Sequence, residues 1–71
     1  MNKMNEIAGK TAGDIWKFLK DNGPTTALKL KSALNVSNGL LHLGLGWLAR
    51  EDKIDIAEHE HTLMISLKSN V

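Results

Sequence analysis

The chain has 71 residues, of which 42% are hydrophobic and 24% charged, with a formal net charge of +1 and no cysteine. A chain of this length forms one domain at most, expected here over residues 1–71, and it cannot easily enclose a substrate cavity of the usual several hundred cubic ångströms. The lack of cysteine excludes disulfides, thiolate nucleophiles and cysteine-based zinc sites, and no nucleophile–base pair is readable, so we expect no enzyme, cofactor or small-molecule substrate.

The first apolar pattern predicts a helix from about Asn5 to Asn22. Apolar residues recur there at steps of three and four, which places them on one helix face. They are Ile7, Ala8, Ala12, Ile15, Trp16 and Leu19. Gly23 and Pro24 end the helix, because glycine accepts the left-handed cap conformation and proline cannot continue the hydrogen bonding.

A shorter helix is expected from about Ala27 to Leu34, with Thr25 or Thr26 as its N-cap. The positions predicted to face inward are Ala27, Leu30, Ala33 and Leu34. The positions predicted to face outward are Lys29, Lys31 and Ser32. Asn35 follows where a tight turn is needed, and asparagine tolerates left-handed backbone.

Ser37 is a further N-cap candidate, and it opens a third helix expected from Asn38 to about Asp52. Its core stripe, at i, i+4 and i+7, consists of Leu41, Leu45 and Leu48. Beyond this helix the apolar period changes to two, over residues 54–56 and again over residues 63–67. This alternation predicts two strands joined by a loop through residues 59–61.

This order of elements resembles a winged helix-turn-helix domain. The residues that match the pattern are Thr25–Thr26, Leu30, Ala33, Leu34, the turn at residues 35–37, and residues 46–54, which look like the end of a recognition helix entering a wing strand. Nearly the whole chain is covered, and it is similar in particular to small stand-alone prokaryotic winged-helix proteins with no assigned activity. The resemblance implies an α+β fold of three helices and a C-terminal wing, with a possible third strand at Thr25–Thr26.

One position departs from the family pattern. Helix-turn-helix proteins usually have a small residue, often alanine, where Lys31 stands. Either its aliphatic stem snorkels outward, or the register of the second helix is shifted by one residue.

The resemblance implies a DNA-binding module of the transcription-regulator type, whose third helix enters the major groove of double-stranded DNA. The positions that would then face DNA are Asn38, Gly39, His42, Leu43 and Gly46. Asn38 would read adenine, His42 a base or phosphate, and Ser37 with the exposed helix amides a phosphate. Lys29 and Lys31, with Lys17 or Lys20, are the expected phosphate anchors.

Charge opposes a conventional version of this interpretation. Residues 37–62 contain two basic and five acidic residues, a net charge of −3, whereas residues 1–36 contain six lysines and three acidic residues, a net charge of +3. DNA affinity depends on cations at the docking surface. The predicted wing loop offers Glu58 and Glu60 instead.

The alternative function is protein contact, most simply as a homodimer that does not bind DNA. Leu40, Leu43 and Trp47 form a second apolar stripe on the third helix. Trp47 either folds under the wing and completes the core, with Gly44 and Gly46 making room, or belongs to an exposed partner surface, or adds a nonpolar contact to DNA. A core in so short a chain rarely supplies more than about 3–5 kcal/mol, which also favours self-association.

Two further features bear on site and location. His59 and His61 form either a solvated polar loop, our interpretation, or half of a metal site closed by a second subunit. The chain shows no export signal and no apolar run of membrane length, so we expect a cytoplasmic protein without membrane contact.

Overall fold

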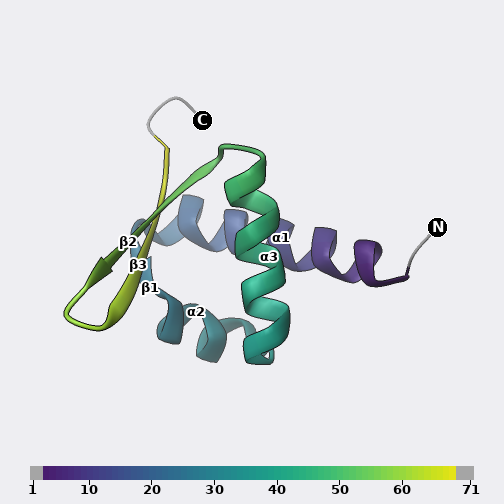
Figure 1. Cartoon of the computed structure of the whole chain (residues 1–71), viewed down its shortest axis with the longest axis horizontal. Helices are drawn as coiled ribbons and strands as arrows, with labels where there is room; N and C mark the ends of the chain where they lie inside the picture. Colours follow the sequence, from purple (N-terminus) through teal and green to yellow (C-terminus); the bar gives the residue numbers. More distant parts are fainter. Residues whose placement is uncertain (1–2, 69–71) are drawn as a thin grey trace.

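The computed structural model describes residues 3–68, which form three helices and a three-stranded antiparallel sheet (Figure 1). The elements are α1 (Lys3–Asn22), β1 (Thr25–Thr26), α2 (Ala27–Leu34), α3 (Asn38–Arg50), β2 (Ile54–His59) and β3 (Thr62–Leu67). The predicted α+β order and the third strand are confirmed. Helix α1 begins two residues before its expected start and α3 ends two before its expected end. The expected domain ends at residues 1 and 71 lie outside the described residues.

Local hydrogen bonds define the ends of α2 and α3 as the sequence predicts. Thr26 Oγ1 accepts a hydrogen bond from the Lys29 N–H at 3.1 Å, and Ser37 Oγ accepts one from the Leu40 N–H at 3.1 Å. Both threonine and serine satisfy helix N–H groups that lack a partner within the helix. Between the two helices Asn35 adopts left-handed backbone, with φ of 53°. These caps place the start of α3 directly after α2.

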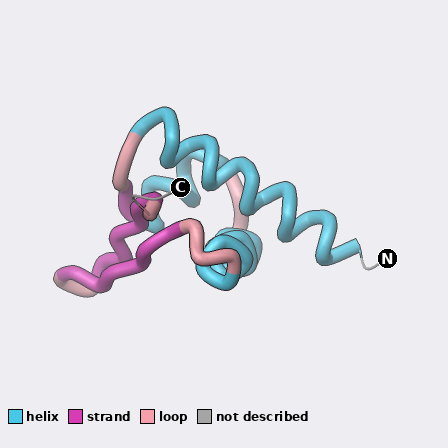
Figure 2. Tube along the Cα trace, turned by 90° about the horizontal axis from the view of Figure 1, so that it is seen from above, coloured by secondary structure: helices cyan, strands magenta, loops and turns pink. Residues whose placement is uncertain are grey.

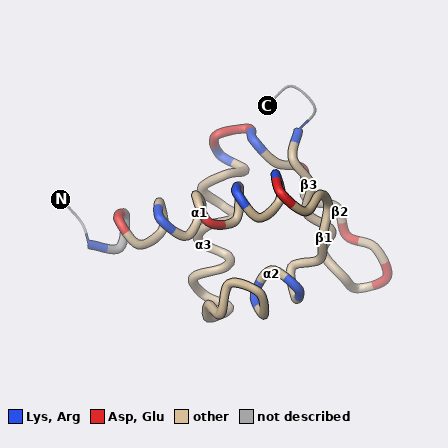
Figure 3. The backbone as a smooth tube through the Cα atoms, turned by 180° about the vertical axis from the view of Figure 1, so that it is seen from behind, with Lys and Arg blue, Asp and Glu red and all other residues tan. Residues whose placement is uncertain are grey.

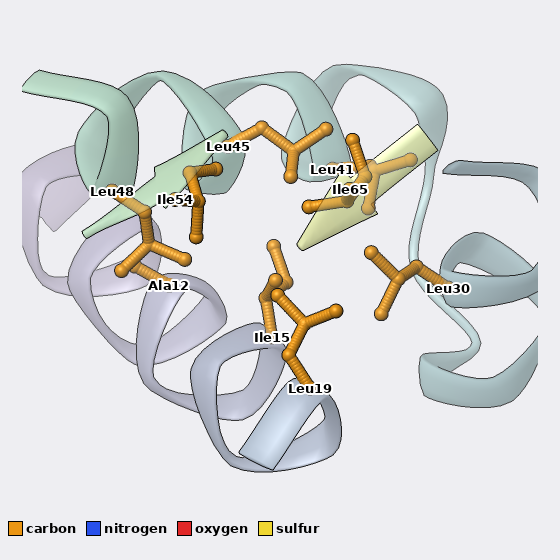
Figure 4. Close-up of a cluster of buried hydrophobic side chains, with 9 residues drawn as sticks. All are labelled: Ala12, Ile15, Leu19, Leu30, Leu41, Leu45, Leu48, Ile54 and Ile65. Atoms are coloured by element: carbon orange, nitrogen blue, oxygen red, sulfur yellow. The ribbon is translucent and has the colours of Figure 1, made fainter. Parts of the chain in front are cut away.

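The core lies where all three helices meet strands β2 and β3 (Figure 4). Its buried residues are Ala12, Ile15, Leu19, Leu30, Leu41, Leu45, Leu48, Ile54 and Ile65. Ile15, Leu30 and Ile65 are fully buried, one each from α1, α2 and β3. The predicted core stripe of α3 is therefore confirmed, and the fold depends on contacts between elements distant in sequence.

Helices α1 and α3 cross closely, and Gly44 permits the approach (Figure 2). A Cβ atom added at Gly44 would lie 2.8 Å from Ile15 Cδ1, 3.0 Å from Thr11 Cγ2 and 3.3 Å from the backbone nitrogen of Ala12. A side chain added there would require the Ile15 and Thr11 side chains to move and the backbone of α1 to shift by a few tenths of an ångström. Gly46, two residues on, faces open space, so the fold itself uses only one of these two glycines.

The predicted inward face of α2 is wrong at one position. Ala33 is exposed, whereas Leu30 is buried and Lys31 is half-buried. The helix packs through Ala27, Leu30 and Leu34. Compared with the predicted inward face, the observed face is rotated, so that it includes Lys31 and excludes Ala33. The bounds of α2 match the prediction, so Lys31 is explained by this rotation: its aliphatic stem lies along the protein surface.

The sheet order is β1-β3-β2, so β3 is central. Thr25 of β1 and Ile56 of β2 both pair with Ile65 of β3. Ile65 therefore closes the core, while β2 extends outward with only Ile54 buried.

Lys68 ties the end of β3 to the turn after α3. Its Nζ lies 2.8 Å from Asp52 Oδ1 and 3.6 Å from Asp55 Oδ1, and its N–H donates to the carbonyl of Lys53 at 3.0 Å. The hydrogen bond and the charge of Asp52 raise the pKa of Lys68 above its ordinary value of 10.5. A lysine whose pKa is higher in the folded than in the unfolded state stabilises the fold as long as the pH is below its pKa in the unfolded chain. The stabilisation by Lys68 is therefore present at neutral pH and is lost as the pH rises above 10.5.

Candidate functional site

A groove of about 300 Å³ separates α2 and the first turns of α3 from the tip of the β2–β3 hairpin. It is lined by Ala27, Leu28, Lys31, Asn38, Leu41, His42, His61, Thr62 and Leu63. Three of the predicted DNA-facing residues, Lys31, Asn38 and His42, thus share one surface. The groove combines a cation, an amide and an imidazole, which are groups that can bind phosphates and base edges.

His42 is oriented by its own helix. Its Nδ1 lies 2.7 Å from the carbonyl oxygen of Asn38, and because a carbonyl only accepts, Nδ1–H is the donor. This tautomer leaves Nε2 of the neutral ring as an acceptor, and the side chain is exposed. His42 can therefore accept a hydrogen bond from a partner at the groove.

The other predicted DNA contacts do not line the groove. Ser37 and Lys29 are exposed, and the Ser37 hydroxyl oxygen is engaged as the cap of α3. Lys17 and Lys20 are on α1, away from the groove lining. Lys20 Nζ lies 4.8 Å from the centre of the Trp16 ring, in a cation–π contact.

The hairpin tip is tighter than the predicted loop and is acidic. Glu60 and His61 form a two-residue turn with φ of 50° and 66°, a backbone that glycine and asparagine adopt more easily. Figure 3 shows the acidic tip of the hairpin, in contrast to the lysines of α2. His59 does not line the groove, so the two wing histidines are not brought together there. Between residues 3 and 68 no group of three or more histidine and acidic side chains could hold a metal ion.

Leu28 and His61 are two of the six groove residues that the predicted DNA site did not include. Leu28 is 74% exposed, the most exposed of the large hydrophobic side chains described. The sequence could have indicated Leu28, because it is an apolar residue of α2 that does not belong to the predicted inward face. His61 enters the groove only because the hairpin turns within two residues, which the sequence did not indicate.

Comparison with known proteins identifies the family. The model of the winged helix-turn-helix domain family DUF2582 matches residues 1–67. The chain belongs to this winged-helix family. It is also 32% identical over 63 residues to the uncharacterized protein MJ1608 of Methanocaldococcus jannaschii, an alignment that covers 84% of this chain and 89% of that protein.

The winged-helix domain also exposes an apolar surface on the side of α3 that faces away from the groove. Leu43 is 44% exposed, Trp47 is 40% exposed and Leu40 is half-buried. Trp47 packs over α1, where its Cζ2 atom lies 3.8 Å from the position of a Cβ on Gly9. The interpretation that Trp47 folds under the wing is therefore wrong, because the close crossing of α1 and α3 directs the indole onto α1.

A hollow of about 270 Å³ lies beside Trp47, between α1 and the C-terminal half of α3. Its lining consists of Gly9, Ala12, Gly13, Trp16, Trp47, Leu48, Glu51 and Lys53. Gly13 is exposed there, and apart from its chain neighbours and the backbone of its own helix no atom lies within 4 Å of the position of its missing Cβ.

No helix of residues 3–68 is both long and apolar enough to span a membrane.

Proposed function

We propose that this winged-helix domain binds double-stranded DNA through the groove between α2, α3 and the hairpin tip, as a module of the transcription-regulator type. The observation that supports this proposal is the shared placement of Lys31, Asn38 and His42 along one groove, at the end of α3 that enters DNA in winged-helix proteins. Membership of the winged helix-turn-helix family agrees with it.

Each of these residues has a chemical role in the proposal. The Asn38 amide can donate to and accept from an adenine edge, and His42 Nε2 accepts from the exocyclic amine of a base. Lys31 and Lys29 pair with phosphates. Ser37 and the first amides of α3 face a phosphate at the positive end of the helix dipole.

The distribution of charge sets the expected strength of binding. The hairpin tip presents Glu58 and Glu60 rather than cations, so α2 and the start of α3 make most of the proposed contacts with DNA. With two or three neutralised phosphates, the logarithm of the affinity should fall with that of salt concentration with a slope of about −2 to −3. We therefore expect weak binding that is detectable at low salt.

Reversing the charge of both α2 lysines tests the proposal. The double variant Lys29→Glu, Lys31→Glu is expected to abolish duplex binding at low salt, because two phosphate contacts become repulsive. Fluorescence anisotropy of a labelled duplex measures this. The matched control is Lys3→Glu, Lys10→Glu, which changes the net charge equally in the N-terminal half of α1, outside the groove lining. The absence of duplex binding by the wild type, or an equal loss in the control, would contradict the proposal.

Ser37 variants separate its capping role from its phosphate contact. Ser37→Ala removes the 3.1 Å cap and should lower the free energy of unfolding by about 1 kcal/mol. Ser37→Asp retains a cap acceptor but adds a negative charge facing the phosphate, so stability should be kept while duplex affinity falls. Thermal melting and anisotropy together measure both effects. Unchanged affinity in Ser37→Asp would remove Ser37 from the interface.

A second candidate function, protein contact, is favoured by the exposed Leu43 and Trp47. Burial of such side chains is a main source of binding energy between proteins, and aromatic residues are prominent in it. These residues and the groove occupy different sides of α3, so protein contact and DNA binding are compatible.

A further inference from the structure

The α1–α3 face, defined here by Leu40, Leu43 and Trp47 of α3 with Gly9 and Gly13 of α1, is apolar and uncovered. It has two projecting side chains, Leu43 and Trp47, that are 44% and 40% exposed. It also has the 270 Å³ hollow beside Trp47. Gly13, which lines this hollow, faces open space. Projections and a depression thus occur on the same surface.

The charge of this face indicates what kind of partner it suits. The chain has no lysine, arginine, aspartate or glutamate between Lys31 and Arg50, so the outer side of α3 is almost uncharged (Figure 3). The rim of the hollow has one acidic and one basic residue, Glu51 and Lys53. A nucleic acid requires cations, whereas a face without a dominant sign does not repel its own copy.

We propose that two copies of this chain pair isologously through the α1–α3 face, with Leu43 and Trp47 of each copy packing into the hollow of the other. An isologous interface uses the same patch on both subunits, so the patch must contain both the projections and the space that receives them. The α1–α3 face meets this requirement. The inference rests on the second candidate function, protein contact, and is independent of DNA binding.

A stable interface needs more area than α3 alone offers, so both α1 and α3 must contribute to it. A stable interface buries about 800 Å² on each partner, which is about a sixth of the 4968 Å² exposed by this chain. Helix α3, with 13 residues, is only about 20 Å long and about 10 Å wide, so its outer side alone is too small. Helix α1 extends beyond α3 at its N-terminal end and widens the surface (Figures 1 and 2).

Sedimentation equilibrium from low to high micromolar concentration tests the pairing. The wild type is expected to show a monomer–dimer equilibrium. Leu43→Asp should raise the dissociation constant about 100-fold, because pairing would bury an unpaired carboxylate. The control Leu28→Asp makes the same chemical change at a leucine that is 74% exposed on α2, and it should leave the equilibrium unchanged.

Gly13→Gln tests the hollow without weakening the monomer. The monomer has open space at Gly13, and glutamine is the better helix former, so the melting temperature measured at dilute, monomeric concentration should rise. The longer side chain fills the hollow, so the dissociation constant should rise at least about tenfold, since a lost packing contact of about 1.4 kcal/mol has that effect. Because the monomer becomes more stable while pairing becomes weaker, unfolding cannot be the cause of the weaker pairing.

Three outcomes would overturn the proposal. They are a monomeric wild type at every concentration, equal dissociation by Leu28→Asp and Leu43→Asp, and a Gly13→Gln variant that pairs as the wild type does. The α2 double variant Lys29→Glu, Lys31→Glu should pair normally, because α2 lies outside the α1–α3 face. A failure of DNA binding is therefore visible separately from a failure of pairing.

Discussion

Replacing Gly44 with alanine is expected to lower the free energy of unfolding by up to about 2 kcal/mol, although alanine is the better helix former. The added methyl group would lie 2.8 Å from Ile15 Cδ1 and 3.3 Å from the backbone nitrogen of Ala12. Overpacking of this kind costs about 1–3 kcal/mol, more than the gain of about 1 kcal/mol in helix propensity. Urea denaturation followed by circular dichroism measures the difference.

The same substitution at Gly46 is the control. No neighbouring atom lies within 4 Å of a Cβ there, so Gly46→Ala should stabilise the domain by up to about 1 kcal/mol. The two variants should then differ by about 5–20 °C in melting temperature for a domain of this size. If both variants were stabilised, the crossing of α1 and α3 would be looser than described.

A double-mutant cycle identifies the contact responsible. Ile15→Val removes the Cδ1 atom that lies nearest to the added methyl group. The variant Gly44→Ala, Ile15→Val should therefore be less destabilised than the sum of its single changes, with a coupling of about 0.5–1 kcal/mol. Strict additivity would instead assign the strain to the Thr11 side chain or the backbone of α1.

Ile65→Ala is the second large effect, with an expected loss of about 2–5 kcal/mol. Ile65 is fully buried and lies at the centre of the sheet, paired with Thr25 and Ile56. A domain this small has a free energy of unfolding of about 3–5 kcal/mol, so the variant should be largely unfolded at 25 °C. Far-UV circular dichroism without denaturant would show this directly.

Ile56→Ala is the matched control, since Ile56 is the strand partner of Ile65 but is 42% exposed. The change in side-chain type is identical, so the loss of β propensity, about 1 kcal/mol at most, is common to both variants. The remaining difference reports burial in the core. Similar losses in both variants would mean that β3 does not close the core.

Local chemistry accounts for the parts of the fold that the sequence predicts well. The capping hydroxyls of Thr26 and Ser37 and the left-handed Asn35 act within four residues of themselves, and all three predictions are confirmed. The change of apolar period likewise located the hairpin. None of these features depends on how distant elements pack.

Tertiary packing accounts for what the sequence could not predict. Gly44 and Gly46 are the same residue type in the same helix, and only the position of α1 distinguishes the buried one from the open one. The exposure of Ala33 follows from the rotation of α2, and the course of Trp47 from the crossing of α1 and α3. Similarly, the groove joins Lys31 to His61 only because the hairpin turns sharply.

The central position of β3 has a consequence for how the chain is made. Ile65, which closes the core, is synthesised after all three helices, and its partner Thr25 lies 40 positions earlier in the chain. The helices therefore leave the ribosome with an open apolar surface, and non-local contacts of this kind slow folding. Folding should accordingly be completed only after β3 has been released from the ribosome, and until then the open core is exposed to chaperones and proteases.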